Sequence, residues 1–258
     1  MINRIWNEIL DRVYPPDLYC ISCGKIIDDT RPYRLCDDCR EIIRWTTGRC
    51  CRKCGKPLTD NNPTDTCFSC REHEHEYDRG FSCAEYGAHE RAIIFNLKYN
   101  DKLHIAQSVG RMMADRMLAE FSADELAVRY DTLVPVPLTK EKRLKRGYNQ
   151  SSLICRWLSE YTGIPYDRKS HHGELLERTK ETAAMKGLSP DERRANVRGS
   201  FAVIDSCAHK LKDASCLIVD DIYTTGATVD EISRVLHAAG ASRIDVLTFA
   251  AGADVVKA

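Results

Sequence analysis

The sequence predicts an α/β fold, with a mainly parallel sheet and helices on both faces, preceded by a small cysteine-rich N-terminal module. Strand-like apolar segments alternate with amphipathic helical segments over residues 80–258, which is the pattern of strand–helix–strand units. Ten of the 13 cysteines fall within the first 83 residues. These two observations predict a cysteine-rich domain at 1–79 and an α/β domain at 80–258.

Charge and hydropathy narrow the class of protein. Lysine plus arginine and aspartate plus glutamate number 38 each, which excludes a protein coated in positive potential but allows a local basic patch. No apolar run reaches the roughly 18 residues of a membrane-spanning helix, and the N-terminus lacks the apolar core of a signal peptide. We expect a cytoplasmic protein with no transmembrane segment. Residues 1–14 are expected to form an amphipathic helix that packs on the rest of the chain.

Eight of the cysteines form an internal repeat. CISCGK at 20–25 leads through a 12-residue gap to CDDC at 36–39, and CRKCGK at 51–56 leads through an equal gap to CFSC at 67–70. Two thiolates separated by two residues can hold one tetrahedral ion, and a second such pair completes the site. The repeat therefore predicts two structural zinc ions, the first bound by Cys20, Cys23, Cys36 and Cys39 and the second by Cys51, Cys54, Cys67 and Cys70.

Several alternatives to this ligand assignment stay open. A disulfide framework is disfavoured because no secretion signal is evident. The pairs could also combine in an interleaved order, and Cys50 could replace Cys51, although only Cys51 preserves the repeat. His73 and His75 are metal-binding residue types, but we expect them to lie in a solvated linker.

The α/β domain is expected to contain four strands and three helices. We expect strands at 80–87, 131–138, 215–221 and 242–250, and helices at 104–121, 151–163 and 228–241. The strand at 131–138 should end or distort at its two prolines, because proline donates no hydrogen bond to a sheet. Gly163 and Gly240 are expected to stop the helices that precede them.

Two adjacent aspartates stand out at the end of the buried strand in CLIVDDIYTTGATVDE, residues 216–231. In a parallel sheet, ligands bind beyond the carboxyl ends of the strands, where Asp220 and Asp221 are expected to lie. Neighbouring strand residues point to opposite faces, so the two carboxylates would reach different atoms of one ligand. Thr228 and Glu231 have capping-box spacing, which predicts a helix beginning near Thr228.

The loop between the aspartates and this helix has the composition of an anion site. Backbone N–H groups at a helix start favour a phosphate, threonine hydroxyls add donors, and Gly226 lets the backbone come close. Carboxylates beside such a loop match the vicinal hydroxyls and phosphate of ribose 5-phosphate. The loop is not a Walker nucleotide site or a dinucleotide site, because GxxxxGK[ST] and GxGxxG are both absent.

These residues resemble the phosphoribosyl pyrophosphate (PRPP) motif of the type I phosphoribosyltransferases. More narrowly, the chain resembles the ComF family of competence-associated proteins, which carry a zinc ribbon before such a domain. The resemblance covers nearly the whole chain and includes NLKYNDK at 96–102, LVPVPL at 133–138, KRGYNQSSL at 145–153 and GLSPDERRANVRGSF at 187–201. One departure is Met185, which stands where the family usually has glutamine and puts a catalytic role of that loop in doubt.

The resemblance implies a role for each matching residue. Catalytic roles fall on Asp220, Asp221, Arg143 and Arg146. PRPP would be bound by Asp220, Asp221, Thr224, Thr225, Gly226, Ala227, Thr228, Lys140 and Gly147, with the turn at 140–147 facing pyrophosphate. The family also implies Mg²⁺ bound together with PRPP, and a mobile hood at 178–198 closing over it.

Two functions follow from the resemblance. In the first, the protein takes part in DNA uptake and natural transformation by handling single-stranded DNA in the cytoplasm, beside other competence proteins at the inner face of the membrane. In the second, it is an active Mg²⁺-dependent phosphoribosyltransferase acting on a small-molecule nucleophile. Single strands bind where basic residues lie beside aromatic ones, which we expect at 140–148 or at Arg52, Lys53, Lys56 and Phe68.

Overall fold

We describe the chain from a computed structural model, over residues 18–99, 103–167, 174–180 and 187–254. The expected helix at 1–14 and the departure at Met185 lie outside the described residues. No helix in these ranges is long and apolar enough to cross a membrane.

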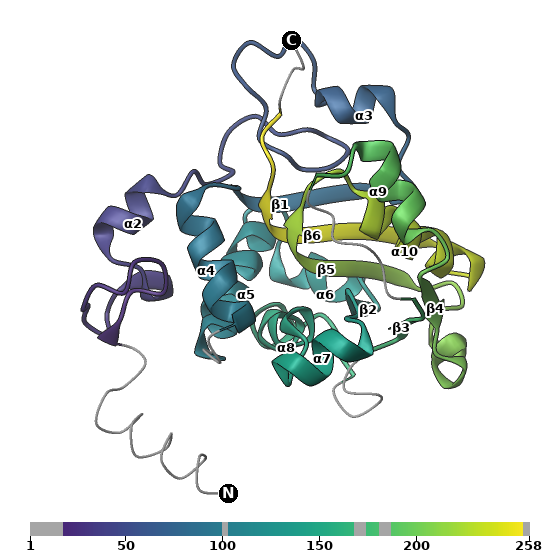
Figure 1. Cartoon of the computed structure of the whole chain (residues 1–258). Helices are drawn as coiled ribbons and strands as arrows, with labels where there is room; N and C mark the ends of the chain where they lie inside the picture. The colour runs from purple at the N-terminus through teal and green to yellow at the C-terminus, as the bar shows by residue number, and fades with distance from the viewer. Residues whose placement is uncertain (1–17, 100–102, 168–173, 181–186, 255–258) are drawn as a thin grey trace, which may run out of the picture.

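The centre of the molecule is a four-stranded parallel sheet in the described part of the chain. Its strands are β1 (Arg79–Glu85), β2 (Thr132–Pro135), β5 (Ser215–Tyr223) and β6 (Arg243–Ala251). Their spatial order is β1-β6-β5-β2, and every neighbouring pair is parallel (Figure 1). The expected parallel sheet is confirmed, and β2 ends at Pro135 as the prolines predict.

Helices cover both faces of this sheet. One face carries α4 (Ala88–Tyr99), α5 (His104–Leu118), α6 (Ala123–Arg129) and α8 (Gln150–Thr162), and the other carries α10 (Ala227–Ala238). Successive side chains of β5 point to opposite faces of the sheet, which explains the two layers of helices. Leu217 and Val219 pack in the hydrophobic cluster under α4, α5 and α8, while Cys216 and Ile218 pack in the cluster under α10. The three predicted helices are thus present, within three residues of their expected ends.

The sequence interpretation missed the short elements. They are η2 (Pro32–Arg34), α2 (Asp37–Ile42), α3 (Phe68–Glu72), α7 (Lys140–Arg146), β3 (Leu176–Arg178), α9 (Pro190–Val197), β4 (Phe201–Val203) and η4 (Asp205–Lys210), and β3 pairs antiparallel with β4. The 12-residue helix α4 and the seven-residue helix α6 were also missed. Three of these helices carried a readable start signal, because Ser122 and Ser189 form capping boxes and Thr139 caps α7.

The two cysteine-rich segments join different core clusters, and in Figure 1 the first lies beside α4 while the second lies above β1. Buried cysteines of the first segment join the cluster beneath α4, α5 and α8, whereas those of the second join the cluster beneath α10. The second segment also touches β1 closely, since a Cβ atom at Gly80 would lie only 2.6 Å from the carbonyl oxygen of Cys54. The cysteine-rich segments therefore share the core of the α/β domain.

Candidate functional site

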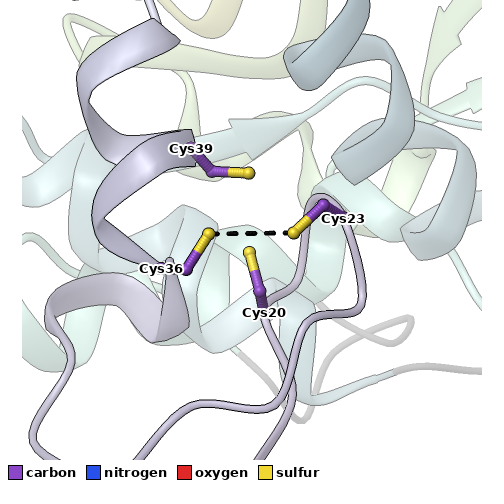
Figure 2. Close-up of side chains that lie close together, drawn as sticks. All are labelled: Cys20, Cys23, Cys36 and Cys39. Atoms are coloured by element: carbon purple, nitrogen blue, oxygen red, sulfur yellow. Dashed lines mark hydrogen bonds between the residues drawn. The ribbon is translucent and has the colours of Figure 1, made fainter.

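The first group of cysteines has the geometry of a tetrahedral zinc site. The sulfur atoms of Cys20, Cys23, Cys36 and Cys39 lie within 4.8 Å of one another and point toward a common centre (Figure 2). The Cys23 and Cys36 sulfurs are 3.7 Å apart. Zn–S bonds of about 2.3 Å at tetrahedral angles place the sulfurs roughly 3.8 Å apart. The residues therefore fit one zinc ion, and the pairing is sequential, not interleaved.

The second group repeats this arrangement. The four sulfurs of Cys51, Cys54, Cys67 and Cys70 also lie within 4.8 Å of one another, and those of Cys54 and Cys67 are 3.6 Å apart. Cys50 is not part of this group, and its thiol contacts the carbonyl oxygen of Gly48. The choice of Cys51 over Cys50 is thus confirmed.

Backbone geometry prepares the first site for a thiolate. Burial raises the pKa of Cys20, but backbone hydrogen bonds from Cys23, Cys36 and Ser22 outweigh it and lower the pKa to about 7. The cysteines outside the two groups behave differently. Burial raises the pKa of Cys83, Cys155 and Cys216, and Cys207 is also buried, as expected of thiols packed in a core.

The histidines after the second group do not lie in a solvated linker, so that expectation is wrong. The His75 side chain is fully buried, and its Nδ1 lies 2.9 Å and 3.0 Å from the two carboxylate oxygens of Asp230. Its Nε2 lies 3.4 Å from the hydroxyl of Tyr223. These partners come from α10 and β5, so their contacts with His75 are not readable from local sequence.

The adjacent aspartates lie near the carboxyl end of β5, as predicted. Asp221 is buried, forms an ion pair with Lys98 of α4, and accepts a 3.0 Å hydrogen bond from Nε2 of Gln150. Asp220 accepts hydrogen bonds from the Ser151 hydroxyl at 3.3 Å and from the Asp221 N–H at 2.9 Å. Both carboxylates thus reach the first turn of α8, and their expected placement on opposite faces stays a prediction.

The two aspartates differ in their ionisation. Burial, followed by the charge of Asp221, raises the pKa of Asp220 to about 7. Burial also opposes ionisation of Asp221, but the neighbouring Lys98 ammonium outweighs it and lowers the pKa of that carboxyl. The pair therefore holds one firmly ionised carboxylate and one whose charge changes near neutral pH. Lys98 lies in the quoted NLKYNDK motif, but its role was not predicted.

The loop after β5 and the start of α10 enclose a small cavity. Asp220, Thr224, Thr225 and Thr228 line it, together with Arg193 from α9. The helix begins at Ala227, one residue before Thr228, so the expected start near Thr228 is confirmed, but Gly226 is its N-cap and the expected capping box is absent. The backbone at Gly226 has φ of +85°, a conformation that favours glycine.

Glu231, the other half of the expected capping box, has different partners. It accepts a 2.8 Å hydrogen bond from the Gly199 N–H and forms an ion pair with Arg234. The first of these bonds connects α10 to Gly199, which follows α9, while the ion pair lies within α10. Glu231 therefore binds the residue next to the expected hood at 178–198 instead of capping its own helix.

The basic segment expected as a turn at 140–147 is mostly helix α7. Arg143 forms an ion pair with the buried Glu174, while Arg146 bonds to the Gln150 side chain that donates to Asp221. Gly147 ends the helix with φ of +79°. Arg146 is thus linked to Asp221 through Gln150, whereas Arg143 forms its ion pair with Glu174. Lys140 is exposed and lines a separate hollow beside residues 177–180.

The basic residues of the second ribbon do not form a continuous surface track. Arg52 is exposed and lies 3.1 Å from Asp65. Lys53 donates to the backbone oxygen of Tyr77. Lys56 is buried, with its ammonium 5.5 Å from the centre of the Tyr223 ring. Lys53 and Lys56 of the expected DNA surface are therefore directed into the protein, whereas Arg52 is not.

A second cavity adjoins the loop on the side of the second ribbon. It is lined by the ribbon residues Lys56, Phe68 and Glu72, by Arg194 of α9 and by Thr224 and Thr225. The C-terminal segment contributes Asp254, whose carboxylate accepts a 3.0 Å hydrogen bond from the Phe68 N–H and a 2.7 Å bond from Asn62. The ribbon is therefore part of the wall of this cavity.

Comparison with known proteins gives matches to both parts of the chain. The double zinc ribbon domain matches residues 9–71 and the phosphoribosyl transferase domain matches residues 174–257. The chain is 30% identical over 170 residues to the DNA utilization protein YhgH of Escherichia coli O157:H7, covering 66% of this chain and 70% of that relative.

Two relatives carry competence names. The chain is 29% identical over 154 residues to competence protein F of Haemophilus influenzae, covering 60% of this chain and 64% of that protein. It is 31% identical over 108 residues to competence protein ComFC of Bacillus subtilis, covering 42% and 39% of the two chains. These matches agree with the two cysteine sites and the parallel sheet, while the boundary at residues 79 and 80 stays a prediction.

Proposed function

The chain belongs to the ComF family, and from this membership we propose that it binds PRPP with Mg²⁺ and acts in DNA uptake by handling single-stranded DNA in the cytoplasm. The relatives' names refer to competence and DNA utilization. None of the 13 cysteines forms a disulfide, which favours a reducing compartment. Other DNA-uptake proteins at the inner face of the membrane are the partners we expect.

The observation that carries the PRPP proposal is the cavity between Asp220 and the start of α10. The Asp220 carboxylate would accept hydrogen bonds from the ribose hydroxyls. The loop at 224–228 would hold the 5-phosphate with its N–H groups and hydroxyls, helped by the positive end of the 12-residue helix. Arg193 of α9 adds a positive charge to the lining of the cavity. One side of the cavity therefore accepts hydrogen bonds and the other side donates them.

The donor set also fits Mg²⁺. This ion takes oxygen ligands and relies on one or two carboxylates together with substrate phosphates. Asp220 is a half-buried carboxyl that lines the cavity, and burial together with the Asp221 charge raises its pKa to about 7, an effect that a bound cation would offset. Asp221 is already compensated by Lys98, so we propose Asp220 as the group that faces the ion and Asp221 as the group that positions α4 and α8.

Calorimetry of PRPP binding tests this site. Asp220→Asn should weaken PRPP binding by roughly 10- to 150-fold, the equivalent of a lost charge-assisted hydrogen bond of about 1.5–3 kcal/mol. Asp245→Asn is a matched control, because Asp245 is a buried aspartate on β6 whose carboxylate bonds to Tyr130 instead of facing the cavity. Unchanged affinity in Asp220→Asn would refute the site.

The helix α7 is the surface that we propose for single-stranded DNA. Lys140, Lys142 and Lys145 are exposed on it, and Leu144 between them has 85% of its surface exposed. Tyr148, half-buried just after the helix, supplies a ring beside these charges. A basic helix with apolar and aromatic neighbours suits a phosphate backbone and unstacked bases.

Charge reversal tests α7 as the DNA surface. Changing Lys140, Lys142 and Lys145 to glutamate should abolish binding of a single-stranded oligonucleotide, while Arg52→Glu on the second ribbon is the control and should have little effect. Wild-type affinity should fall with salt at a slope of about 0.7 per neutralised phosphate. Salt-independent binding, or equal loss in the Arg52→Glu control, would contradict α7 as the DNA surface.

The second cavity favours an alternative function, an active phosphoribosyltransferase. It adjoins the threonines of the proposed phosphate loop and offers Phe68 together with charged residues to an acceptor molecule. Release of pyrophosphate from PRPP, measured with amines, nucleobases or single-stranded DNA added, tests it. Pyrophosphate release that needs a small molecule and is unaffected by DNA would favour the transferase function. No pyrophosphate release with amines, nucleobases or single-stranded DNA would rule that function out.

A further inference from the structure

We propose that His73, His75 and Asp230 form a third zinc site, distinct from the two cysteine sites. The candidate ligand atoms of these residues lie within 4.8 Å of one another. His73 is the C-cap of α3 in the second ribbon, and Asp230 lies in the first turn of α10. The site would therefore join the ribbon to the helix whose start forms the proposed phosphate loop.

The distances fit a small divalent ion. One oxygen of Asp230 lies 2.9 Å from Nδ1 of His75 and 3.7 Å from Nε2 of His73. Bonds from zinc to nitrogen and oxygen of about 2.0–2.2 Å at tetrahedral angles separate neighbouring ligand atoms by roughly 3.4 Å. The two measured distances bracket this value, so small side-chain rotations would suffice.

Surrounding hydrogen bonds already orient the ligands. The Asp230 carboxylate accepts a 3.2 Å hydrogen bond from the Glu76 N–H, and Nε2 of His75 lies 3.4 Å from the Tyr223 hydroxyl. Imidazole ligands of metals commonly use their second nitrogen in this way, which fixes the ring and its tautomer. With Nδ1 of His75 on the metal, Nε2–H would donate to Tyr223.

Exposure and open space suit a site with three protein ligands. The side chains of His75 and Asp230 are 0% and 10% exposed, whereas that of His73 is 33% exposed. His73 and Asp230 also line a cavity shared with Asp191 and Arg194 of α9. This cavity leaves room for a water molecule as the fourth ligand. Two imidazoles and a carboxylate are a ligand set that zinc accepts.

Metal analysis of the full-length protein tests the proposal. The wild type should contain three zinc ions per chain after purification with zinc, whereas His73→Gln and Asp230→Asn should contain two. His209→Gln is the matched control, because His209 is an exposed histidine in η4 far along the chain, and it should keep three. The two ions that remain in the variants show that the cysteine sites, and hence the fold, are intact.

Cobalt provides a second measurement on the protein with both cysteine sites filled by zinc. One added equivalent of Co²⁺ should give weak visible absorption without the sulfur-to-cobalt charge-transfer bands of a thiolate site. His73→Gln and Asp230→Asn should remove this absorption. The proposal would be overturned if the wild type held only two zinc ions and gave no cobalt signal. It would also be overturned if both variants kept the third ion, or if the added cobalt showed charge-transfer bands.

Discussion

The raised pKa of Asp220 predicts that PRPP binding depends on pH. A carboxyl that titrates near 7 is about 9% ionised at pH 6 and about 91% ionised at pH 8. If the ribose hydroxyls and Mg²⁺ need the ionised form, the affinity of the wild type should rise by about tenfold over this range. Burial and the neighbouring Asp221 charge cause the shift, so the effect belongs to this pair and not to aspartates in general.

The assay is calorimetry of PRPP with saturating Mg²⁺ at pH 6, 7 and 8, for the wild type and for Asp220→Asn. The phosphates of PRPP also titrate in this range, and the variant corrects for them because it binds the same ligand without the carboxyl. The ratio of wild-type to variant affinity should therefore rise by about tenfold from pH 6 to pH 8. A ratio that stays constant would refute the reasoning.

Stability should change in the opposite direction to binding. Between pH 3.8 and about 7 the folded chain keeps a proton on Asp220 that the unfolded chain has lost. Unfolding in this window therefore releases a proton, so stability falls as pH rises through it. At pH 8, Asp220→Asn should melt at the same temperature as the wild type or higher, although it binds PRPP more weakly. A lower melting temperature at pH 8 would mean that the carboxylate is compensated within the free protein.

Three further predictions follow from single contacts. Structural zinc sites contribute about 10–16 kcal/mol, so chelation of zinc should unfold the ribbons. Because Cys54 packs against Gly80, the amide protons of β1 should then also lose their protection from hydrogen exchange, and full protection of β1 would contradict this. Gly226→Ala should weaken PRPP binding and lower the melting temperature, since its Cβ would lie 2.6 Å from the Tyr223 hydroxyl, and wild-type values for both would contradict it. Lys98→Met should destabilise the fold by about 3–5 kcal/mol in denaturant melts by leaving Asp221 uncompensated, and adding Asp221→Asn should restore most of the loss.

Local sequence patterns predicted the features that depend on neighbouring residues. The spacing of the eight cysteines predicted both clusters, because ligands from tight turns are fixed by a few residues. Buried apolar runs located β2, β5 and β6, and Gly163 ended α8 as expected. The loop at 224–228 and the start of α10 were located to within one residue, but the capping residue was not, because a glycine in the left-handed region takes the place of the expected threonine.

Contacts between distant segments could not be read in this way. Lys98 reaches Asp221 across 123 positions, and His75 reaches Asp230 across 155. No local sequence pattern predicts either contact, because each depends on how α4 and the second ribbon pack against the sheet. The same reason explains Lys56, which the sequence suggested as a surface residue and which lies buried beside Tyr223.

The position of the second ribbon changes what its zinc can do. Sequence spacing alone suggests an independent module whose metal stabilises only its own residues. In the structure, however, the Phe68 N–H of this ribbon bonds to Asp254 beyond β6, and the Tyr77 hydroxyl bonds to that of Tyr223 at 2.7 Å. Tyr223 immediately precedes the proposed phosphate loop. Metal binding in the ribbon and ligand binding at the loop thus act on one packed unit, and any effect of zinc on PRPP affinity must be matched by an equal effect of PRPP on zinc affinity.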